Sequence, residues 1–319
     1  MNVRQVVPKD AIPSVDEPAF TDEYFGDPED EVIVVEGTEA ARAYPIRILN
    51  YHEIVNDEFA GEPIAVTWCP LCGSAVVYDR TVDGRTLTFG VSGKLADDDL
   101  VMYDRETGTE WKQSHGEAIA GPLEGTSLSV RPAAMTIHEQ FREDRPEGRV
   151  LARSGGASEA SGPSDEREPI DYDEAPYAEY FESDGFGLAA HRGEGSRDWD
   201  RADLEPKAVV LGIERGGDAL GFPLERVEEA GGVAAAAVGG RSIAAFATPD
   251  GIHAFENPGH EFTPTDEPEW FRADGTRWNG ATGESEDGRQ LDRAPARRLF
   301  AFAWRDDHGD DAFWSPEYL

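Results

Sequence analysis

An internal repeat is the feature of this chain that most constrains its fold. Four blocks of the first half recur in the same order in the second half, with small insertions and deletions. The paired segments are 32–49 and 210–227, 61–66 and 240–245, 107–117 and 274–284, and 125–133 and 288–296. Each block marks a fixed backbone event, such as a turn at an aromatic-proline pair or a glycine before a strand. The repeat predicts two copies of one domain, with Trp111 and Trp278 at equivalent core positions.

Within each copy most local patterns predict strands. The runs EVIVVEG, PIAVTW, SAVVYDR, TLTFGVSG and LVMYDR are short, rich in Val, Thr and aromatic residues, and bounded by Gly, Asp or Pro. These properties are typical of strands joined by tight turns, and Asp83-Gly84 predicts a hairpin turn. The candidate helices are 44–57 and 134–144. We therefore expect a mainly antiparallel β fold with a few short helices, of the α+β class, formed by two similar β-rich domains.

Composition indicates the domain limits. The expected parts are a first domain at 1–153, an acidic linker or crossing segment at 154–200, and a second, degenerate copy at 201–319. Residues 153–169, RSGGASEASGPSDEREP, are rich in Gly, Ser and Pro, as flexible linkers are. In the repeat, Thr248 and Gly251 stand opposite Cys69 and Cys72, so the second copy has no cysteine. A functional site is therefore expected in the first copy.

The charge balance excludes several classes of partner. The formal net charge is −36 over 319 residues, with four lysines against twenty-five arginines. A nucleic-acid-binding protein needs a basic face, and an anionic membrane surface would repel this chain. A carboxylate-rich, lysine-poor surface is typical of proteins kept soluble in high salt, where charge repulsion is screened. Acidic runs such as KLADDDL and WRDDHGDD are accordingly interpreted as solvated surface.

The chain carries no recognisable membrane or export signal. No apolar run approaches the roughly 18 residues of a membrane span, and the N-terminus lacks a basic-then-apolar pattern. We therefore expect a soluble cytoplasmic protein whose partner is a small molecule or another protein, with no nucleic acid and no membrane.

Cys69 and Cys72, in the stretch TWCPLCGSAVVYDR, are the only cysteines. Three interpretations stay open: thiol–disulfide chemistry, a bound metal ion, or a non-catalytic binding or assembly module in which buried thiols are structural. Redox chemistry needs a lowered thiol pKa, usually from a helix that begins at the first cysteine. Here GSAVVYDR predicts a strand instead, so the helix that would lower the thiol pKa is absent.

The strand–turn–strand context favours the metal interpretation. C-P-x-C-G between two strands resembles the knuckle of rubredoxins and zinc ribbons, in which the glycine adopts a positive φ. Such a knuckle supplies two ligands, and His52 is the favoured third. Thiolates with histidine suit zinc, whereas thiolates with methionine suit Cu(I). The other candidate ligands are Met102, His115 and His138.

Further residues are candidates for lining the site. Glu53, Asn56 and Asp57 follow His52 and carry groups suited to acid–base chemistry. Ser92 and Lys94, in FGVSGKL, would suit an anion, although the spacing is not that of a phosphate-binding P-loop. Whether the protein is an enzyme stays open at this point.

Taken together, six motifs carry a resemblance to a known family. The motifs are AYPIRIL, HEIVND, TWCPLCGSAVVYDR, FGVSGKL, DLVMYDRETGTEW and GEAIAGPLEGTSL. Over roughly residues 30–153 they resemble the family known as domain of unknown function 3179, and the acidic composition fits a haloarchaeal-type member. The resemblance implies no activity. It implies that the HEIVND, CPLCG and SGKL blocks are hallmarks of the family.

Overall fold

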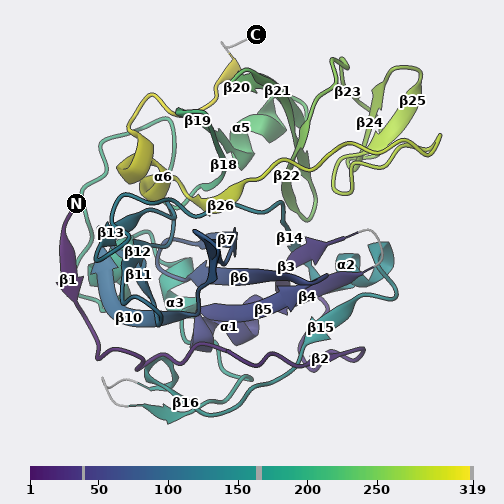
Figure 1. Cartoon of the computed structure of the whole chain (residues 1–319). Coiled ribbons are helices and arrows are strands. Elements are labelled where there is room, and N and C mark those ends of the chain that lie inside the picture. The colour runs from purple at the N-terminus through teal and green to yellow at the C-terminus, as the bar shows by residue number, and fades with distance from the viewer. Residues whose placement is uncertain (38–39, 163–166, 317–319) are drawn as a thin grey trace.

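Antiparallel strands dominate the structure, as the β-branched and aromatic runs predict. The computed structural model describes residues 1–37, 40–162 and 167–316 (Figure 1). The strands of the first half are β1 (Val3–Gln5), β2 (Phe20–Thr21), β3 (Glu31–Glu36), β4 (Ala41–Pro45), β5 (Ile54–Phe59), β6 (Glu62–Cys69), β7 (Ser74–Asp79), β8 (Thr81–Val82), β9 (Arg85–Thr86), β10 (Phe89–Ala96), β11 (Asp99–Asp104), β12 (Glu110–Lys112), β13 (Ala118–Ala120), β14 (Ala134–Ile137) and β15 (Arg149–Leu151).

The remaining elements complete the sheets and cover them. The later strands are β16 (Ala157–Ser158), β17 (Glu168–Pro169), β18 (Val209–Arg215), β19 (Asp218–Pro223), β20 (Val233–Val238), β21 (Arg241–Thr248), β22 (Gly251–Glu256), β23 (Thr263–Pro264), β24 (Trp270–Ala273), β25 (Thr276–Asn279) and β26 (Arg297–Phe300). The helices are α1 (Ile46–His52), α2 (His138–Asp144), η1 (Glu159–Ser161), α3 (Ala178–Glu182), α4 (Gly187–His191), α5 (Leu224–Glu229) and α6 (Ala301–His308).

The largest sheet of the described residues contains strands from both halves of the chain. Its order is β19-β18-β26-β7-β6-β5, and two further sheets have the orders β1-β10-β11-β12-β13 and β14-β3-β4-β15-β2. Strand β26 pairs with β18 on one side and meets β7 at Arg298 and Ala75 on the other. In Figure 1 this strand lies between the green elements of the second half and the blue elements of the first.

The alternation of side chains along β6 explains why this sheet is buried on both faces. Ile64, Val66 and Trp68 point to one side and join the core beneath α1. Ala65 and Cys69 point to the other side and join the core formed with β10, β11 and α6. Because successive strand residues face opposite sides, one short apolar run contributes to two cores.

Both candidate helices are shorter than predicted. Helix α1 ends at His52, since Glu53 adopts a left-handed conformation (φ 56°) and its N–H donates to Leu49 O at 2.7 Å. The prediction of helix to residue 57 is therefore wrong, because the β-branched Ile54 and Val55 pair with β6 as a strand. In the same way 134–137 form β14, and α2 begins only at His138. Asp83 and Gly84 form the predicted two-residue turn between β8 and β9, both with positive φ.

The two halves follow the same order of elements. In the first, β3 and β4 pair, α1 follows, β5, β6 and β7 form a meander, and β14 returns to pair with β3. In the second, β18 and β19 pair, α5 follows, β20, β21 and β22 form a meander, and β26 returns to pair with β18. Trp111 and Trp278 are both fully buried. The domain limits and the duplication itself stay predictions that these matching orders motivate.

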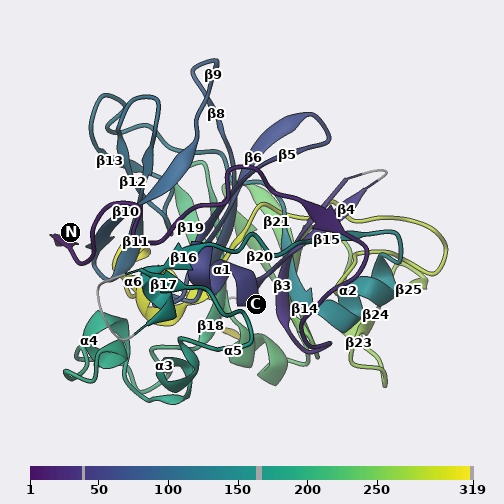
Figure 2. The same ribbon diagram turned by 90° about the horizontal axis from the view of Figure 1, so that it is seen from below.

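The predicted linker, 154–200, packs against the first half. It carries β16, β17, α3 and α4, which Figure 2 shows grouped on one side of the molecule. Tyr177, Tyr180 and Phe186 are buried in the core that contains the cysteines. The Tyr180 hydroxyl donates to Leu71 O at 2.6 Å. Such aromatic anchoring is that of a crossing segment, the other form predicted for 154–200. Residues 163–166 of the predicted linker lie outside the described residues.

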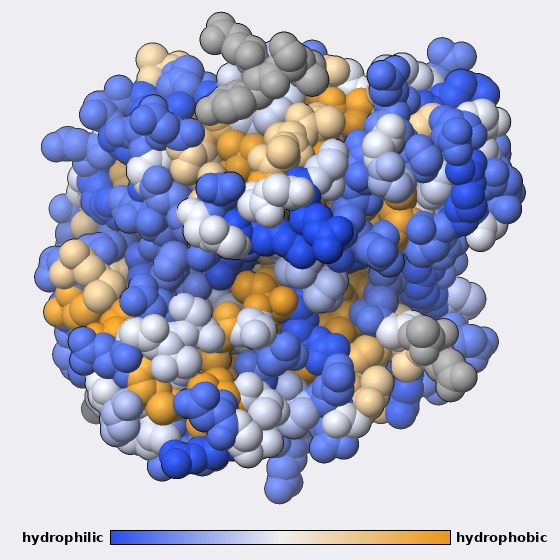
Figure 3. Space-filling view, turned by 45° about the horizontal axis from the view of Figure 1, so that its top comes forward, coloured by the Kyte–Doolittle hydropathy of each residue, from blue (hydrophilic) through white to orange (hydrophobic). Residues whose placement is uncertain are grey.

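The surface is dominated by hydrophilic residues, with scattered apolar patches in the hollows between them on the face that Figure 3 shows. None of the helices within the described ranges is long and apolar enough to cross a bilayer.

Candidate functional site

The two cysteines lie at the turn between β6 and β7, in the strand–turn–strand context that the sequence predicts. Gly73 has a positive φ of 55°, and a Cβ atom there would lie 2.7 Å from the Phe300 ring. Only glycine therefore fits without strain. The Phe300 N–H donates to Cys72 O at 2.8 Å, so β26 holds the turn from outside.

A buried group of three acidic side chains forms the centre of the site. The sulfur atoms of Cys69 and Cys72 and a carboxylate oxygen of Asp99 all lie within 4.8 Å of one another. The cysteines are free and 3.7 Å apart. Asp99 is 1% exposed, and its Oδ1 atom has no hydrogen-bond partner among the described residues. The Cys72 thiol donates to Asp98 O at 3.3 Å.

Burial keeps the two thiols protonated. It raises the pKa of the Cys69 thiol and raises that of Cys72 well above its ordinary value, with the neighbouring Asp99 carboxylate acting in the same direction. It also raises the pKa of Asp99 to about 6, although the Lys112 ammonium opposes this. A buried acid without a compensating cation prefers its neutral form. The two thiols therefore hold protons that a cation could replace.

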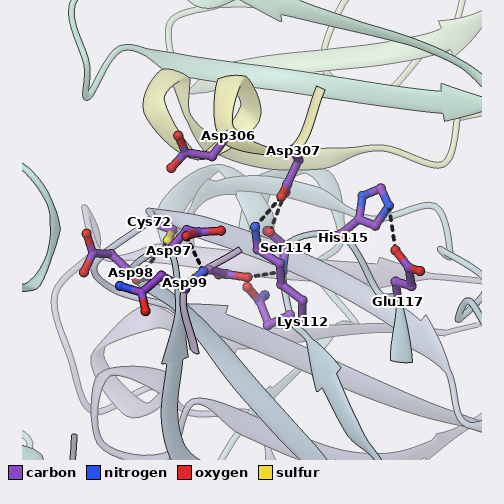
Figure 4. Close-up of polar contacts among 12 residues, drawn as sticks. Cys72, Asp97, Asp98, Asp99, Lys112, Ser114, His115, Glu117, Asp306 and Asp307 are labelled. Atoms are coloured by element: carbon purple, nitrogen blue, oxygen red, sulfur yellow. Dashed lines mark hydrogen bonds and ion pairs between the residues drawn. The ribbon is translucent and has the colours of Figure 1, made fainter. Parts of the chain in front are cut away.

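One buried ion pair lies beside this centre (Figure 4). Lys112 contacts Asp307 of α6, and the two side chains are 7% and 5% exposed. Although burial works to lower the pKa of Lys112, the carboxylates of Asp307 and Asp99 raise it. Ser114 connects the two acids, because its N–H donates to Asp99 Oδ2 at 2.8 Å and its hydroxyl donates to Asp307 Oδ2 at 2.6 Å.

A cavity of about 90 Å³ adjoins Cys69. Its walls are mainly apolar, and its polar lining includes Glu53, Lys94 and His191. The left-handed conformation at the end of α1 places Glu53 here, where its Oε2 atom has no hydrogen-bond partner among the described residues. Burial raises the pKa of Glu53 to about 8, assisted by the carboxylates of Glu159 and Asp99. A neutral carboxylic acid and a thiol thus face one small cavity.

The structure gives His52 other partners than the cysteines. Its Nδ1 atom lies 2.8 Å from Pro13 O, and its Nε2 atom lies 2.6 Å from the Tyr172 hydroxyl. Both ring nitrogens are therefore engaged, and the ring fixes the N-terminal segment and Tyr172 onto α1. His52 is not part of the close group formed by Cys69, Cys72 and Asp99.

Asn56 and Asp57, predicted to line the site, hold strands together instead. The Asn56 side chain donates to Phe89 O at 2.8 Å and accepts from Phe89 N–H at 2.9 Å. Asp57 Oδ2 accepts from Arg42 and from the Tyr44 hydroxyl, both at 2.6 Å. Because these hydrogen bonds occupy both side chains, Asn56 and Asp57 have a structural role.

The remaining predicted residues are distributed around the centre. The Ser92 hydroxyl donates to Val101 O at 2.5 Å, in the register shift between β10 and β11. Lys94 lines the cavity and contacts Glu110 at 2.5 Å. Met102 is fully buried in β11. His115 lies in the turn after β12, outside the thiol group.

Sequence reasoning missed Asp99 and Asp307. Their runs, KLADDDL and WRDDHGDD, were expected to be solvated, but both side chains are buried. A signal for each existed. Asp99 immediately precedes the apolar strand LVMY, and Asp307 lies three residues after the buried Trp304, on the same helix face.

Comparison with known proteins identifies one relationship. A family model described as a protein of unknown function, DUF3179, matches residues 9–311. No curated protein and no solved structure matches the chain.

Proposed function

This chain belongs to the DUF3179 family, whose description assigns no activity, and we propose that it is a metal-binding protein whose ion is held by Cys69, Cys72 and Asp99. One observation carries the proposal: two free thiols and a carboxylate, all buried, converge within 4.8 Å. Asp99 here takes the place that the sequence suggested for His52, whose ring nitrogens are engaged elsewhere.

The balance of charge supports a cation at this position. Cys69, Cys72, Asp99 and Glu53 are acidic groups in one buried region, and burial raises the pKa of each of them. The nearby Lys112 is already paired with Asp307. A transition-metal ion would displace the thiol protons and compensate the thiolates, as metal binding generally does. It would also give the unpartnered Oδ1 atom of Asp99 a partner.

The donor set favours zinc. Two thiolates with a carboxylate suit a tetrahedral Zn²⁺ ion, whereas Cu(I) binds to thiolates and has little use for a carboxylate. Three protein ligands leave a fourth position, and Glu53 or a small molecule entering the adjoining cavity is available to fill it. A site of this kind also requires reduced thiols, which fits a cytoplasmic protein.

A second candidate is a binding module for a small molecule without metal. The cavity beside Cys69 favours it, since apolar walls with a few polar groups are typical of ligand sites. Its small volume limits the ligand to a few heavy atoms. Thiol–disulfide catalysis is less well supported: the 3.7 Å approach would allow a disulfide, but a reactive thiol needs a lowered pKa and burial raises both.

Metal analysis of protein purified without chelators tests the proposal. We expect about one sulfur-coordinated zinc ion per chain, and no sulfur-coordinated zinc after Cys69→Ser with Cys72→Ser. Asp99→Asn should weaken binding, whereas Asp97→Asn is the matched control, because Asp97 lies two positions away and accepts a hydrogen bond from Asn2 N–H. Because a second metal site elsewhere would obscure simple counting, the ion is identified by its sulfur coordination in X-ray absorption. If the bound ion shows no sulfur coordination after the protein is loaded with Zn²⁺ or Cu(I), the proposal is wrong.

A further inference from the structure

A second group of candidate ligands lies where three distant segments meet. His115 lies in the turn between β12 and β13, Glu214 on β18, and His308 at the end of α6. Their ligand atoms all lie within 4.8 Å of one another. The side chains of His115 and Glu214 are 26% and 33% exposed, so solvent reaches the group.

We propose that His115, Glu214 and His308 bind a divalent transition-metal ion, with Zn²⁺ as the preferred occupant. Two imidazoles and one carboxylate are a common ligand set for zinc that keeps one position open to water. This site is distinct from the buried cysteine centre and does not depend on it.

The orientation of His115 is that of a metal ligand. Its Nδ1 atom lies 3.8 Å from Glu214 Oε2 and has no hydrogen-bond partner among the described residues. In tetrahedral zinc sites, ligands at about 2.1 Å are separated from each other by about 3.4 Å. The observed separation is too long for a hydrogen bond, and a small side-chain adjustment would bring both atoms onto an ion.

The other nitrogen of His115 faces a carboxylate. Nε2 lies 3.7 Å from Glu117 Oε2, and Figure 4 shows the two side chains directed at each other. Histidines that bind metals commonly direct their second nitrogen at a carboxylate, which fixes the ring and strengthens the ligand. Glu117 is thus placed as a positioning residue for His115.

His308 is held in position by its own helix. Its ring packs on Trp304, four residues earlier, with ring centroids 3.9 Å apart, and its centroid lies 5.4 Å from that of His115. No side-chain hydrogen bond of His308 occurs among the described residues. The imidazole is therefore oriented by packing and keeps its nitrogens available.

One positive charge opposes a cation here. Arg297 Nη1 lies 3.5 Å from Glu214 Oε2, and its Nη2 donates to His115 O at 3.0 Å. The guanidinium therefore holds the backbone of one ligand and the carboxylate of another. The carboxylates of Glu214 and Glu117 together outweigh this charge.

Metal binding would join parts of the chain that are far apart in sequence. An ion shared by the β12–β13 turn, β18 and α6 would fasten the second half to the first. A ligand that binds only the folded state raises stability by RT ln(1 + [L]/Kd), so zinc at about 100 times its Kd would add about 2.7 kcal/mol.

The test uses the Cys69→Ser, Cys72→Ser double variant, so that thiol ligation does not contribute. We expect calorimetry to show about one Zn²⁺ per chain and a higher melting temperature with Zn²⁺. His115→Gln and Glu214→Gln should each weaken binding by more than about tenfold, and Glu117→Gln by about tenfold. The matched control is His260→Gln, because His260 is a partly exposed histidine of the second half. This variant should leave the affinity for Zn²⁺ unchanged.

A further readout separates ligation from a structural effect. Cu²⁺ bound at this site should show nitrogen hyperfine coupling in its electron paramagnetic resonance spectrum, and His115→Gln should reduce it. The exposed Glu214→Gln variant keeps the experiment decisive if a histidine variant folds poorly. Absence of Zn²⁺ binding in the double variant, or unchanged affinity in Glu214→Gln and His115→Gln, would overturn the proposal. Neither result bears on the cysteine centre.

Discussion

The Lys112–Asp307 pair provides the most demanding test of how the molecule is held together. Both side chains are almost fully buried, and Lys112 comes from β12 whereas Asp307 comes from α6. Lys112→Met keeps the aliphatic stem and removes the charge, leaving the carboxylate of Asp307 uncompensated. Loss of one partner from a buried ion pair costs about 3–5 kcal/mol, mainly because of the remaining charge. With an m-value of about 3 kcal/mol/M, the urea midpoint should fall by about 1–1.7 M.

The matched control is Lys94→Met. Lys94 pairs with Glu110 in the same way, but the side chains are 32% and 20% exposed. Partly exposed pairs contribute about 1 kcal/mol or less, so this variant should lose little. Adding Asp307→Asn to Lys112→Met removes the orphaned charge and should recover about 2 kcal/mol. Urea unfolding followed by tryptophan fluorescence measures all three variants. Equal losses for Lys112→Met and Lys94→Met, or no recovery in the double variant, would refute the reasoning.

Three further predictions concern the turn, acid and salt. Gly73→Ala should destabilise the protein by about 2–4 kcal/mol in urea unfolding, because the residue has a positive φ and its Cβ would meet Phe300; a loss below about 1 kcal/mol would contradict this. Burial lowers the pKa of His253 to about 3, against about 6.5 when unfolded. The free energy of unfolding is therefore unaffected by His253 above pH 6.5. It falls as the pH drops toward 3, because the unfolded chain binds a proton on this imidazole that the folded protein excludes. At pH 5 the loss is about 2 kcal/mol, and His253→Leu should abolish that part of the acid sensitivity; identical pH profiles would exclude it. With a net charge of −36, the melting temperature should rise between about 0.1 M and 2 M KCl, and a flat response would argue against adaptation to salt.

Local patterns were sufficient to predict the class of fold and the cysteine turn. Alternating or β-branched runs became strands, and the glycine after Cys72 adopts the positive φ that the motif suggests. The same local view failed at residues 54–57, where the pairing of Ile54 and Val55 with β6 decides in favour of strand over helix. The local pattern of residues 44–57 cannot distinguish these outcomes, because the deciding contacts come from another segment.

The composition of the site depended still more on distant contacts. The sequence motifs favoured His52 as a ligand beside the cysteines, yet its ring nitrogens contact Pro13 O and the Tyr172 hydroxyl. Asp99 and Asp307 belong to acidic runs, in which the individual buried residue is hard to distinguish from its solvated neighbours. Burial of a charge is decided by what packs over it. The sequence carries that information only through the complete fold.

The position of β26 has a consequence for the order of events during synthesis. Arg298 donates to Gly73 O across 225 positions of the chain, and Phe300 meets the cysteine turn from the same strand. At about 5–20 residues per second, a ribosome needs about 11–45 s to make the intervening chain. During this time the cysteine turn of the nascent first half lacks the cover that β26 later provides. A metal ion or a chaperone therefore has time to reach the thiols. In a ribosome-arrested chain that ends before β26, Cys72 should react rapidly with thiol reagents. In a longer arrested chain, from which α6 has already emerged from the ribosome, Cys72 should be protected.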